Sequence, residues 1–413
     1  MSQPPNSVIL PPIWRCMALS AVLRMGEVAG AGVSLNQPPG GICTLAWRVA
    51  PTPEPAQATA ASTAAYAARF PQLSRTYHFR KLRLPGQSEP VQVSSLGLGT
   101  YLGAPNDATD AGYAAAVEAA LAGGINVMDT AINYRNQRSE RAIGRALRAT
   151  GIARGEVFLC SKAGYLAENA ALPPGLIRPG ELVGGCHCMA PVFLAHQLQT
   201  SLENLGVEAL DVFYLHNPET QQAELSREEF YRRVRAAFEL CEKQAAQGRI
   251  RAYGVATWSG LRVPPDEANY LDLNRMVGIA RELAGEEHHF RFVQLPFNLA
   301  MPEAYSLLNQ VVDKPPYVSA LNAAFRLGLH TMASASLMNG RLLPLPDEVK
   351  QHLQGFLPPA ASDAELALQF VRSTAGVTTA LVGMSNPAHV TANLRAAAVA
   401  PAPPSQIAKL LQQ

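Results

Sequence analysis

The sequence predicts an α/β fold, a (β/α)8 or TIM barrel, because eight short apolar runs alternate with longer amphipathic stretches. The runs are apolar throughout and bounded by Gly or polar residues, which is typical of parallel strands buried on both faces. They are residues 96–99, 126–128, 157–160, 212–215, 253–255, 292–295, 329–332 and 380–382. The helical patterns include residues 107–121, 139–147, 228–247, 363–372 and 387–394. A doubly wound sheet is the alternative, but no Gly-x-Gly-x-x-Gly turn leads from a strand into a helix.

Two further segments precede the predicted barrel strands. Residues 77–82 and 91–93, joined by the turn Leu84-Pro85-Gly86-Gln87, indicate an N-terminal β-hairpin. Residues 1–75 are rich in Pro, Ala, Ser and Gln and contain no Lys, Asp or His. We expect them to form a poorly ordered, low-complexity extension, with an organelle transit peptide as the alternative. The barrel domain is therefore expected over residues 76–413.

The composition limits the partners of this chain of 413 residues. Its 34 Lys and Arg nearly balance 32 Asp and Glu, so no broad basic surface for nucleic acid is expected. Six widely spread cysteines do not indicate a disulfide scaffold. No apolar run approaches the roughly 20 residues of a spanning helix. These features predict a soluble, cytoplasmic protein with a small-molecule partner, or a plastid or mitochondrial one if residues 1–75 are a transit peptide. They leave the oligomeric state open.

Ionisable side chains follow three consecutive predicted strands, and active sites of such barrels lie at the C-terminal strand ends. Asp129 follows the second run, with Tyr134 five residues later, Lys162 follows the third, and His216 the fourth. Singly, such residues are more often caps, structural partners or solvated charges. Together they suit proton transfer to a carbonyl oxygen. The Tyr134 pKa, ordinarily about 10, would be lowered by Lys162, which Asp129 would hold in place, while His216 would orient the substrate.

A Schiff base on Lys162, as in an aldolase, is a competing use of a strand-end lysine. That chemistry needs a neutral amine, and a neighbouring Asp129 opposes neutrality. The sequence therefore favours the proton-transfer interpretation over the lyase.

The same residues resemble a known family. Residues 124–131, followed by Tyr134 and by 144–147, resemble the signature of the aldo-keto reductases. Residues 157–162, 201–216 and 248–255 resemble that family's next strands, and the resemblance runs from about Tyr77 to about Leu394. It implies an NAD(P)H-dependent oxidoreductase that reduces an aldehyde or ketone, or oxidises the alcohol, with Asp129, Tyr134, Lys162 and His216 as the catalytic residues.

The resemblance also implies NADPH, without excluding NADH, bound in an extended form. The coenzyme contacts it implies are Thr100, Thr257, Gln294, Ser334, Leu337, Gly383, Ser385 and Asn393. Gln294 matches the glutamine that holds the nicotinamide carboxamide, and the loop 383–386 before a helix suits a phosphate. Several positions depart from the family. Ala256 and Thr257 stand where the family often has Ser-Asn, so one carboxamide contact differs. Ser334 stands where the family has a tyrosine that stacks on the nicotinamide, and the ring of Trp258 or Phe297 could take its place. Gly383 and His389 replace cations for the 2′-phosphate.

The remaining predictions concern the substrate. By position, Tyr101 and Asn217 are candidate substrate contacts. The loop Cys186-His187-Cys188 offers soft metal ligands, but adjacent ligands cannot easily face one ion, so we expect no metal and a role in shaping the substrate site. A different class of function, an NADP-binding regulatory subunit or sensor with little turnover, stays open.

Overall fold

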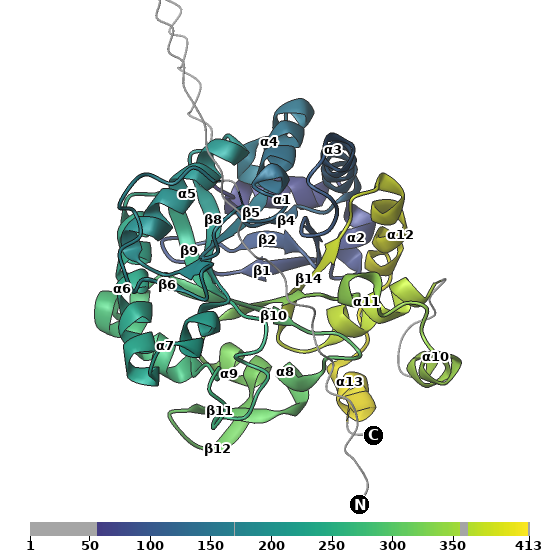
Figure 1. The fold of residues 1–413 in the computed structure, drawn as a ribbon. Coiled ribbons are helices and arrows are strands. Elements are labelled where there is room, and N and C mark those ends of the chain that lie inside the picture. Colours follow the sequence, from purple (N-terminus) through teal and green to yellow (C-terminus); the bar gives the residue numbers. More distant parts are fainter. Residues whose placement is uncertain (1–55, 169, 356–361, 412–413) are drawn as a thin grey trace, which may run out of the picture. The chain divides into compact units, whose positions relative to one another are not determined.

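The computed structural model describes residues 56–168, 170–355 and 362–411. Its centre is a closed barrel of eight parallel strands, surrounded by helices (Figure 1). Around the barrel the strands are β3 (Leu96–Gly99), β4 (Val127–Asp129), β5 (Phe158–Ala163), β8 (Leu210–His216), β9 (Ile250–Ala256), β10 (Phe290–Pro296), β13 (His330–Ser334) and β14 (Val377–Gly383). Each coincides with one predicted apolar run to within a few residues, so the predicted (β/α)8 fold is confirmed.

In the described part of the chain, eight helices between or after the barrel strands surround the barrel. They are α3 (Asp107–Gly123), α4 (Arg138–Thr150), α5 (Pro191–Leu205), α6 (Arg227–Ala246), α7 (Leu273–Ala284), α9 (Ala320–Arg326), α11 (Asp363–Ser373) and α12 (Pro387–Ala397). The sequence analysis found five of them and missed α5, α7 and α9. Helix α5 has no capping side chain, but it begins at Pro191 and is followed by Gly206, whose φ of 68° is left-handed.

Smaller elements join the main ones. The helices are α8 (Glu303–Ser306), α10 (Asp347–Gln354) and α13 (Pro404–Leu411), and the 3-10 turns are η1 (Arg154–Glu156), η2 (Pro218–Ala223), η3 (Gly285–Glu287) and η4 (Met338–Gly340). Two hairpins lie in loops, β6 (Leu182–Val183) with β7 (His187–Cys188) and β11 (Leu308–Val312) with β12 (Lys314–Ser319). None of the helices in the described ranges has the length and apolar character needed to cross a membrane.

The predicted N-terminal hairpin closes the barrel from below. Strands β1 (Phe79–Leu82) and β2 (Val91–Ser94) are antiparallel. Their side chains Leu82, Val91 and Val93 are buried in one cluster with inward-facing residues of the barrel strands, among them Phe158 and Phe292. The hairpin thus fills the barrel interior at this end. A ligand site is therefore expected at the opposite end, where the strands have their C-termini.

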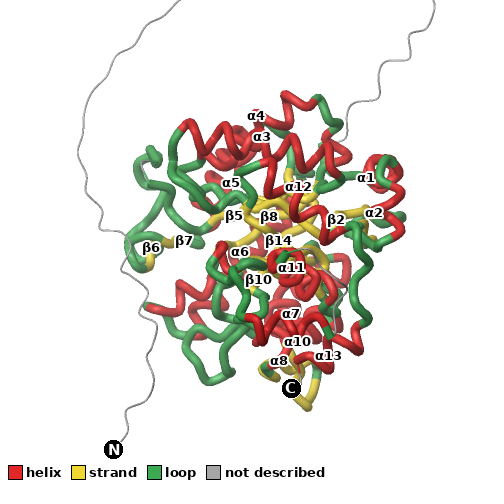
Figure 2. Tube along the Cα trace, turned by 90° about the vertical axis from the view of Figure 1, so that its right-hand side faces the viewer, coloured by secondary structure: helices red, strands yellow, loops and turns green. Residues whose placement is uncertain are grey.

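Two helices precede the hairpin, α1 (Ala60–Ala68) and α2 (Pro71–Arg75), in a segment the sequence analysis placed in the extension. Tyr66 and Leu73 are buried; the Tyr66 hydroxyl donates to the Leu121 carbonyl at 2.7 Å, and the Ala58 N–H donates to Asp211 at 2.8 Å. Figure 2 shows α1, α2 and β2 at one end of the barrel and the β6–β7 hairpin at the other. The packed structure therefore begins upstream of residue 76. Residues 1–55, which carry the transit-peptide alternative, lie outside the described residues.

If residues 56–75 are part of the folded barrel, Tyr66→Ala should destabilise it strongly. Tyr66 is fully buried against Phe70 and Phe79, and such truncations cost about 3–5 kcal/mol. Denaturant unfolding should show this loss, while Tyr77→Ala, whose side chain is 72% exposed, should change the free energy of unfolding by only about 0.5 kcal/mol. Equal effects of the two substitutions would show that the segment is not integral.

Candidate active site

The C-terminal ends of the barrel strands bring the predicted site residues to one rim. Asp129, His216 and Ser334 are the last residues of β4, β8 and β13, and Gly383 is the last residue of β14. Lys162 and Gln294 lie one and two residues before the ends of β5 and β10, and Thr100 and Thr257 follow β3 and β9 directly. Because neighbouring strands are parallel and paired in register, these eight positions form a ring.

A buried ion pair lies at the centre of this ring. The Lys162 Nζ atom is 2.5 Å from Asp129 Oδ1 and 2.8 Å from the Thr130 carbonyl oxygen, and the Lys162 side chain is fully buried. The other carboxylate oxygen, Asp129 Oδ2, accepts a hydrogen bond from Gln294 Nε2 at 2.8 Å. Burial alone would lower the pKa of Lys162, but Asp129 and Tyr134 outweigh it and raise that pKa above its usual value. Lys162 is therefore a fixed cation.

Tyr134 lies over this cation, with Lys162 Nζ 4.9 Å from the centre of its ring. The sequence analysis expected Lys162 to lower the pKa of Tyr134. Lys162 does act in that direction, but burial is the larger cause and leaves the pKa of Tyr134 raised. The hydroxyl consequently holds its proton at neutral pH.

His216 completes the group, with its ring 5.6 Å from that of Tyr134 between centroids. Burial, with Lys162 and His187 nearby, lowers the pKa of His216 well below its usual value, so the imidazole is neutral. Its Nδ1 atom is buried and has no hydrogen-bond partner among the described residues. The structure thus brings together all four residues that the sequence analysis chose as catalytic.

The turn between Tyr134 and α4 has an unusual backbone. Arg135, Asn136 and Gln137 have φ values of 48°, 56° and 69°, so three consecutive non-glycine residues are left-handed. Such a conformation costs about 1–2 kcal/mol per residue. It turns the chain sharply from the tyrosine into α4.

Several predicted coenzyme contacts surround the ion pair. Thr100 Oγ1 donates to the Asp129 carbonyl oxygen at 3.3 Å. The Thr257 hydroxyl donates to Glu219 Oε1 at 2.6 Å and accepts from the Gly260 N–H at 2.9 Å. Thr257 therefore holds the turn after β9, where Glu219 also accepts from the next backbone N–H at 2.8 Å. Sequence reasoning missed Glu219, because only the path of η2 brings it under this turn.

The other predicted coenzyme contacts lie along β13, β14 and α12. Gly383 and Ser385 are exposed, Ser334 and Leu337 are half-buried, and Asn393 is buried on α12. Helix α12 starts directly after this loop, with the Asn386 side chain accepting from the Ala388 N–H at 2.9 Å.

The two rings considered as substitutes for a stacking tyrosine differ. Phe297 is fully buried and stacks on Phe370 with centroids 5.4 Å apart, so it belongs to the core and cannot reach a ligand. Trp258 is 42% exposed at the end of β9 and stays available.

Of the predicted substrate contacts, Tyr101 is exposed and its ring lies 5.1 Å from that of Tyr134. Asn217 follows His216 in a left-handed conformation, and its amide is 3.4 Å from the Tyr165 hydroxyl. Tyr165 itself, missed from the sequence, packs its ring edge-on against His216 at 5.2 Å. Tyr101 and Tyr165 thus lie on either side of the Tyr134–His216 pair.

The Cys186-His187-Cys188 loop contacts the backbone of His216 through the His187 side chain. Gln221 Nε2 donates to His187 Nδ1 at 2.9 Å, and the other side-chain amide atom, Gln221 Oε1, accepts from Arg233 at 2.6 Å. His187 Nε2 therefore carries the proton and donates to the His216 carbonyl oxygen at 2.8 Å. Both ring nitrogens are used, and no group of three metal-binding side chains occurs in the described parts of the chain.

With this geometry established, residues 95–264 match the family model described as "Aldo/keto reductase family", which spans β3 to the turn after β9. This segment of the chain is similar to the aldo/keto reductase family. The family resemblance drawn from the sequence is thereby confirmed, on the segment that holds Asp129, Tyr134, Lys162 and His216.

Solved aldo/keto reductase structures share the fold. One from Klebsiella pneumoniae, in complex with NADP and acetate, is 22% identical with a TM-score of 0.55, over 80% of this chain and 94% of that one. A glycerol dehydrogenase from Gluconobacter oxydans is 20% identical with a TM-score of 0.56, over 80% and 94%.

Among curated relatives, a putative voltage-gated potassium channel subunit beta from Schizosaccharomyces pombe is 25% identical over 78% of this chain and 91% of that protein. A D-threo-aldose 1-dehydrogenase from a Pseudomonas species is 28% identical over 69% and 83%. The named relatives thus include both an enzyme and a channel subunit.

The buried His187 should make the stability of this protein depend on pH. Burial lowers the pKa of His187 to about 4, so the unfolded chain takes up its proton first as the pH falls. The free energy of unfolding should decline between about pH 6.5 and pH 4, by up to about 1.4 kcal/mol per pH unit from this group. His187→Gln should flatten that decline in denaturant titrations, and the exposed His389→Gln should not. Identical slopes in all three proteins would contradict a neutral, buried His187.

Proposed function

We propose that this protein is an NADP(H)-dependent oxidoreductase that reduces an aldehyde or ketone, or oxidises the corresponding alcohol. The observation that carries the proposal is the convergence of a protonated Tyr134, the Lys162–Asp129 ion pair and a neutral His216 within one end of the barrel. Acids and cations placed in this way match the charge that develops on a carbonyl oxygen during reduction.

Each residue has a distinct role in this proposal. Tyr134 donates its proton to the carbonyl oxygen, and the neighbouring Lys162 stabilises the phenolate that remains. Asp129 keeps Lys162 charged and fixed through the 2.5 Å contact. His216, neutral at working pH, hydrogen-bonds the substrate oxygen and orients it. In the oxidative direction the Tyr134 phenolate accepts the proton of the alcohol hydroxyl.

The nicotinamide coenzyme would supply or accept the hydride at the carbonyl carbon. The residues at the rim fit such a group, because the Gln294 carboxamide lies 2.8 Å from Asp129, beside the proposed acid. Gln294 would hold the nicotinamide amide, and the Trp258 ring would stack on the nicotinamide. The loop 383–386 before α12, in which Gly383 and Ser385 are exposed, would hold phosphate. The related structures from Klebsiella pneumoniae with NADP and with NADPH support this assignment.

The choice between NADPH and NADH is to be tested directly. Residues 383–394 contain no Lys or Arg to face a 2′-phosphate, and His389 is exposed. Both coenzymes therefore belong in the first assay.

Tyr134→Phe should abolish proton donation while leaving coenzyme binding intact. The expected loss in kcat is about 10²–10⁴-fold, the usual contribution of a positioned acid. Turnover is followed by NADPH and NADH absorbance with aldehydes, ketones and sugar lactols, the last because a relative is named for aldose oxidation. Coenzyme affinity is followed by fluorescence quenching. Full turnover in the variant would remove Tyr134 from the mechanism, and binding of neither coenzyme to the wild type would overturn the proposed function.

The alternative Schiff-base chemistry is opposed by the charge of Lys162. Borohydride added with a carbonyl substrate should leave Lys162 unlabelled in a mass spectrum of the protein. Lys162→Met should nonetheless lower kcat, since the phenolate of Tyr134 would lose its cation. A reduced adduct on Lys162 would favour the lyase.

A second candidate function is an NADP-binding regulatory subunit with little turnover, favoured by the channel-subunit relative. Tight coenzyme binding without oxidation of the coenzyme on any carbonyl would support it. The complete set of Tyr134, Lys162, Asp129 and His216 favours the enzyme.

A further inference from the structure

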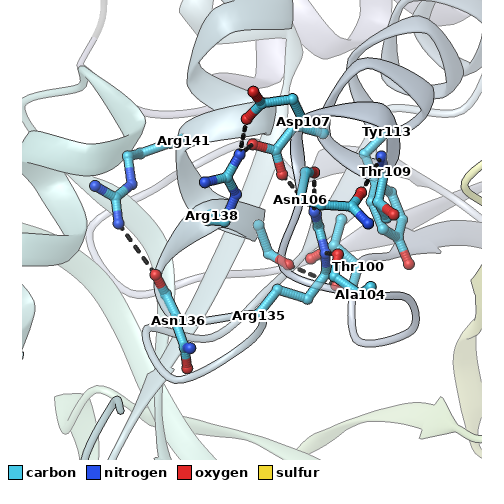
Figure 3. Close-up of polar contacts among 12 residues, drawn as sticks. Thr100, Ala104, Asn106, Asp107, Thr109, Tyr113, Arg135, Asn136, Arg138 and Arg141 are labelled. Carbon is cyan, nitrogen blue, oxygen red and sulfur yellow. Dashed lines mark hydrogen bonds and ion pairs between the residues drawn. The ribbon is translucent and has the colours of Figure 1, made fainter. Parts of the chain in front are cut away.

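The Arg135 side chain, next in sequence to Tyr134, is buried beneath the loop that follows β3 (Figure 3). Only 1% of this side chain is exposed, and 6% of the Asp110 side chain that pairs with it. The guanidinium also donates from Nε to the Ala104 carbonyl at 3.1 Å and from Nη2 to the Asn106 carbonyl at 3.3 Å. It lies 5.1 Å from the centre of the Tyr113 ring. Arg135 therefore joins the start of the turn to the loop and to α3.

The far end of the same left-handed turn is also tied down. Arg138 donates to Asp110 at 2.7 Å and pairs with Asp107, and the Ser139 hydroxyl donates to the Thr100 carbonyl at 2.7 Å. Arg141 donates to the Asn136 carbonyl at 3.0 Å (Figure 3). A turn of three left-handed non-glycine residues persists only when its surroundings fix it. Arg135 is the one of these anchors that adjoins the tyrosine.

The loop held by Arg135 includes Tyr101, whose ring packs edge-on against Tyr134 at 5.1 Å. One buried guanidinium thus fixes both the backbone beside Tyr134 and the segment that leads to the ring covering it. We propose that Arg135 is a positioning residue, which acts through this turn to keep the Tyr134 hydroxyl aligned with Lys162 and His216. This inference rests on the proposed function of Tyr134 as the acid.

The discriminating control uses the same carboxylate. Arg145 Nη2 also lies 3.5 Å from Asp110 Oδ2, but the Arg145 side chain is 52% exposed. Arg145 lies on α4, well beyond the left-handed turn. A purely structural role for Arg135, in fastening α3 to α4, would be shared with Arg145. A positioning role would belong to Arg135 alone.

The experiment compares Arg135→Leu, Arg135→Lys and Arg145→Ala in the full chain. Arg135→Leu should lower kcat by about tenfold to a hundredfold, since small misplacements of a reacting group have effects of this size. The KM for the coenzyme should change little, and the alkaline limb of the pH–rate profile should shift. Arg135→Lys keeps the charge but not the forked contacts, so it should recover part of kcat even if Arg135→Leu fails to fold.

A readout independent of turnover separates this inference from the proposed function. In NMR spectra with ring-labelled tyrosine, the Tyr134 signal is assigned by its loss in Tyr134→Phe. That signal should move in the Arg135 variants and stay in place in Arg145→Ala. A moved signal in a protein that turns over no carbonyl would uphold Arg135 and overturn only the proposed function. An unmoved signal, with kcat and the pH profile unchanged, would overturn the positioning role.

Discussion

The Lys162 ammonium group lies inside the barrel with none of its side chain exposed, where an unpaired charge would cost several kcal/mol. Its partners therefore cannot vary independently. Asp129 and the Thr130 carbonyl satisfy the cation, and Gln294 satisfies the second Asp129 oxygen. These contacts tie the ends of β4, β5 and β10 together. A change in any one of them leaves another buried polar group without a partner.

The same ion pair also sets the charge states of its neighbours. Lys162 stays protonated because Asp129 and Tyr134 outweigh burial. Burial and the positive charge of Lys162 both keep His216 neutral, while burial keeps Tyr134 protonated against the influence of Lys162. The site therefore contains one fixed cation, Lys162, beside two neutral groups that can carry a proton, Tyr134 and His216. Acid–base chemistry at neutral pH requires neighbouring titratable groups whose environments shift their pKa values in different directions.

Much of this arrangement could be predicted from the sequence, because strands buried on both faces leave continuous apolar runs. Reading the residue at the end of each run located Asp129, Lys162 and His216. The net direction of the Tyr134 pKa could not be predicted, since it depends on how deeply neighbouring loops bury the ring. His187 and Glu219 were missed as supports because their contacts depend on the paths of a long loop and a 3-10 turn.

The segment before residue 76 shows a similar limit. Its Ala- and Ser-rich composition indicated disorder, yet it contains three large apolar residues, Tyr66, Phe70 and Leu73, of which Tyr66 and Leu73 are buried and Tyr66 packs against Phe70. Composition averages over the whole segment, whereas burial depends on these few large residues.

The two ends of the barrel consequently meet different physical demands. At the closed end, side chains of the hairpin fill the interior, and Tyr66 of α1 donates to the Leu121 carbonyl of α3. At the open end, three left-handed residues follow Tyr134 at about 1–2 kcal/mol each, a sizeable fraction of the 5–15 kcal/mol by which a domain is typically stable. Such strain persists only where buried contacts fix the turn from both sides, as Asp110 does through Arg135 and Arg138. The stability gained by packing at one end thus allows a strained, well-fixed geometry at the other, and the strain lies directly beside the side chain that must be placed most accurately.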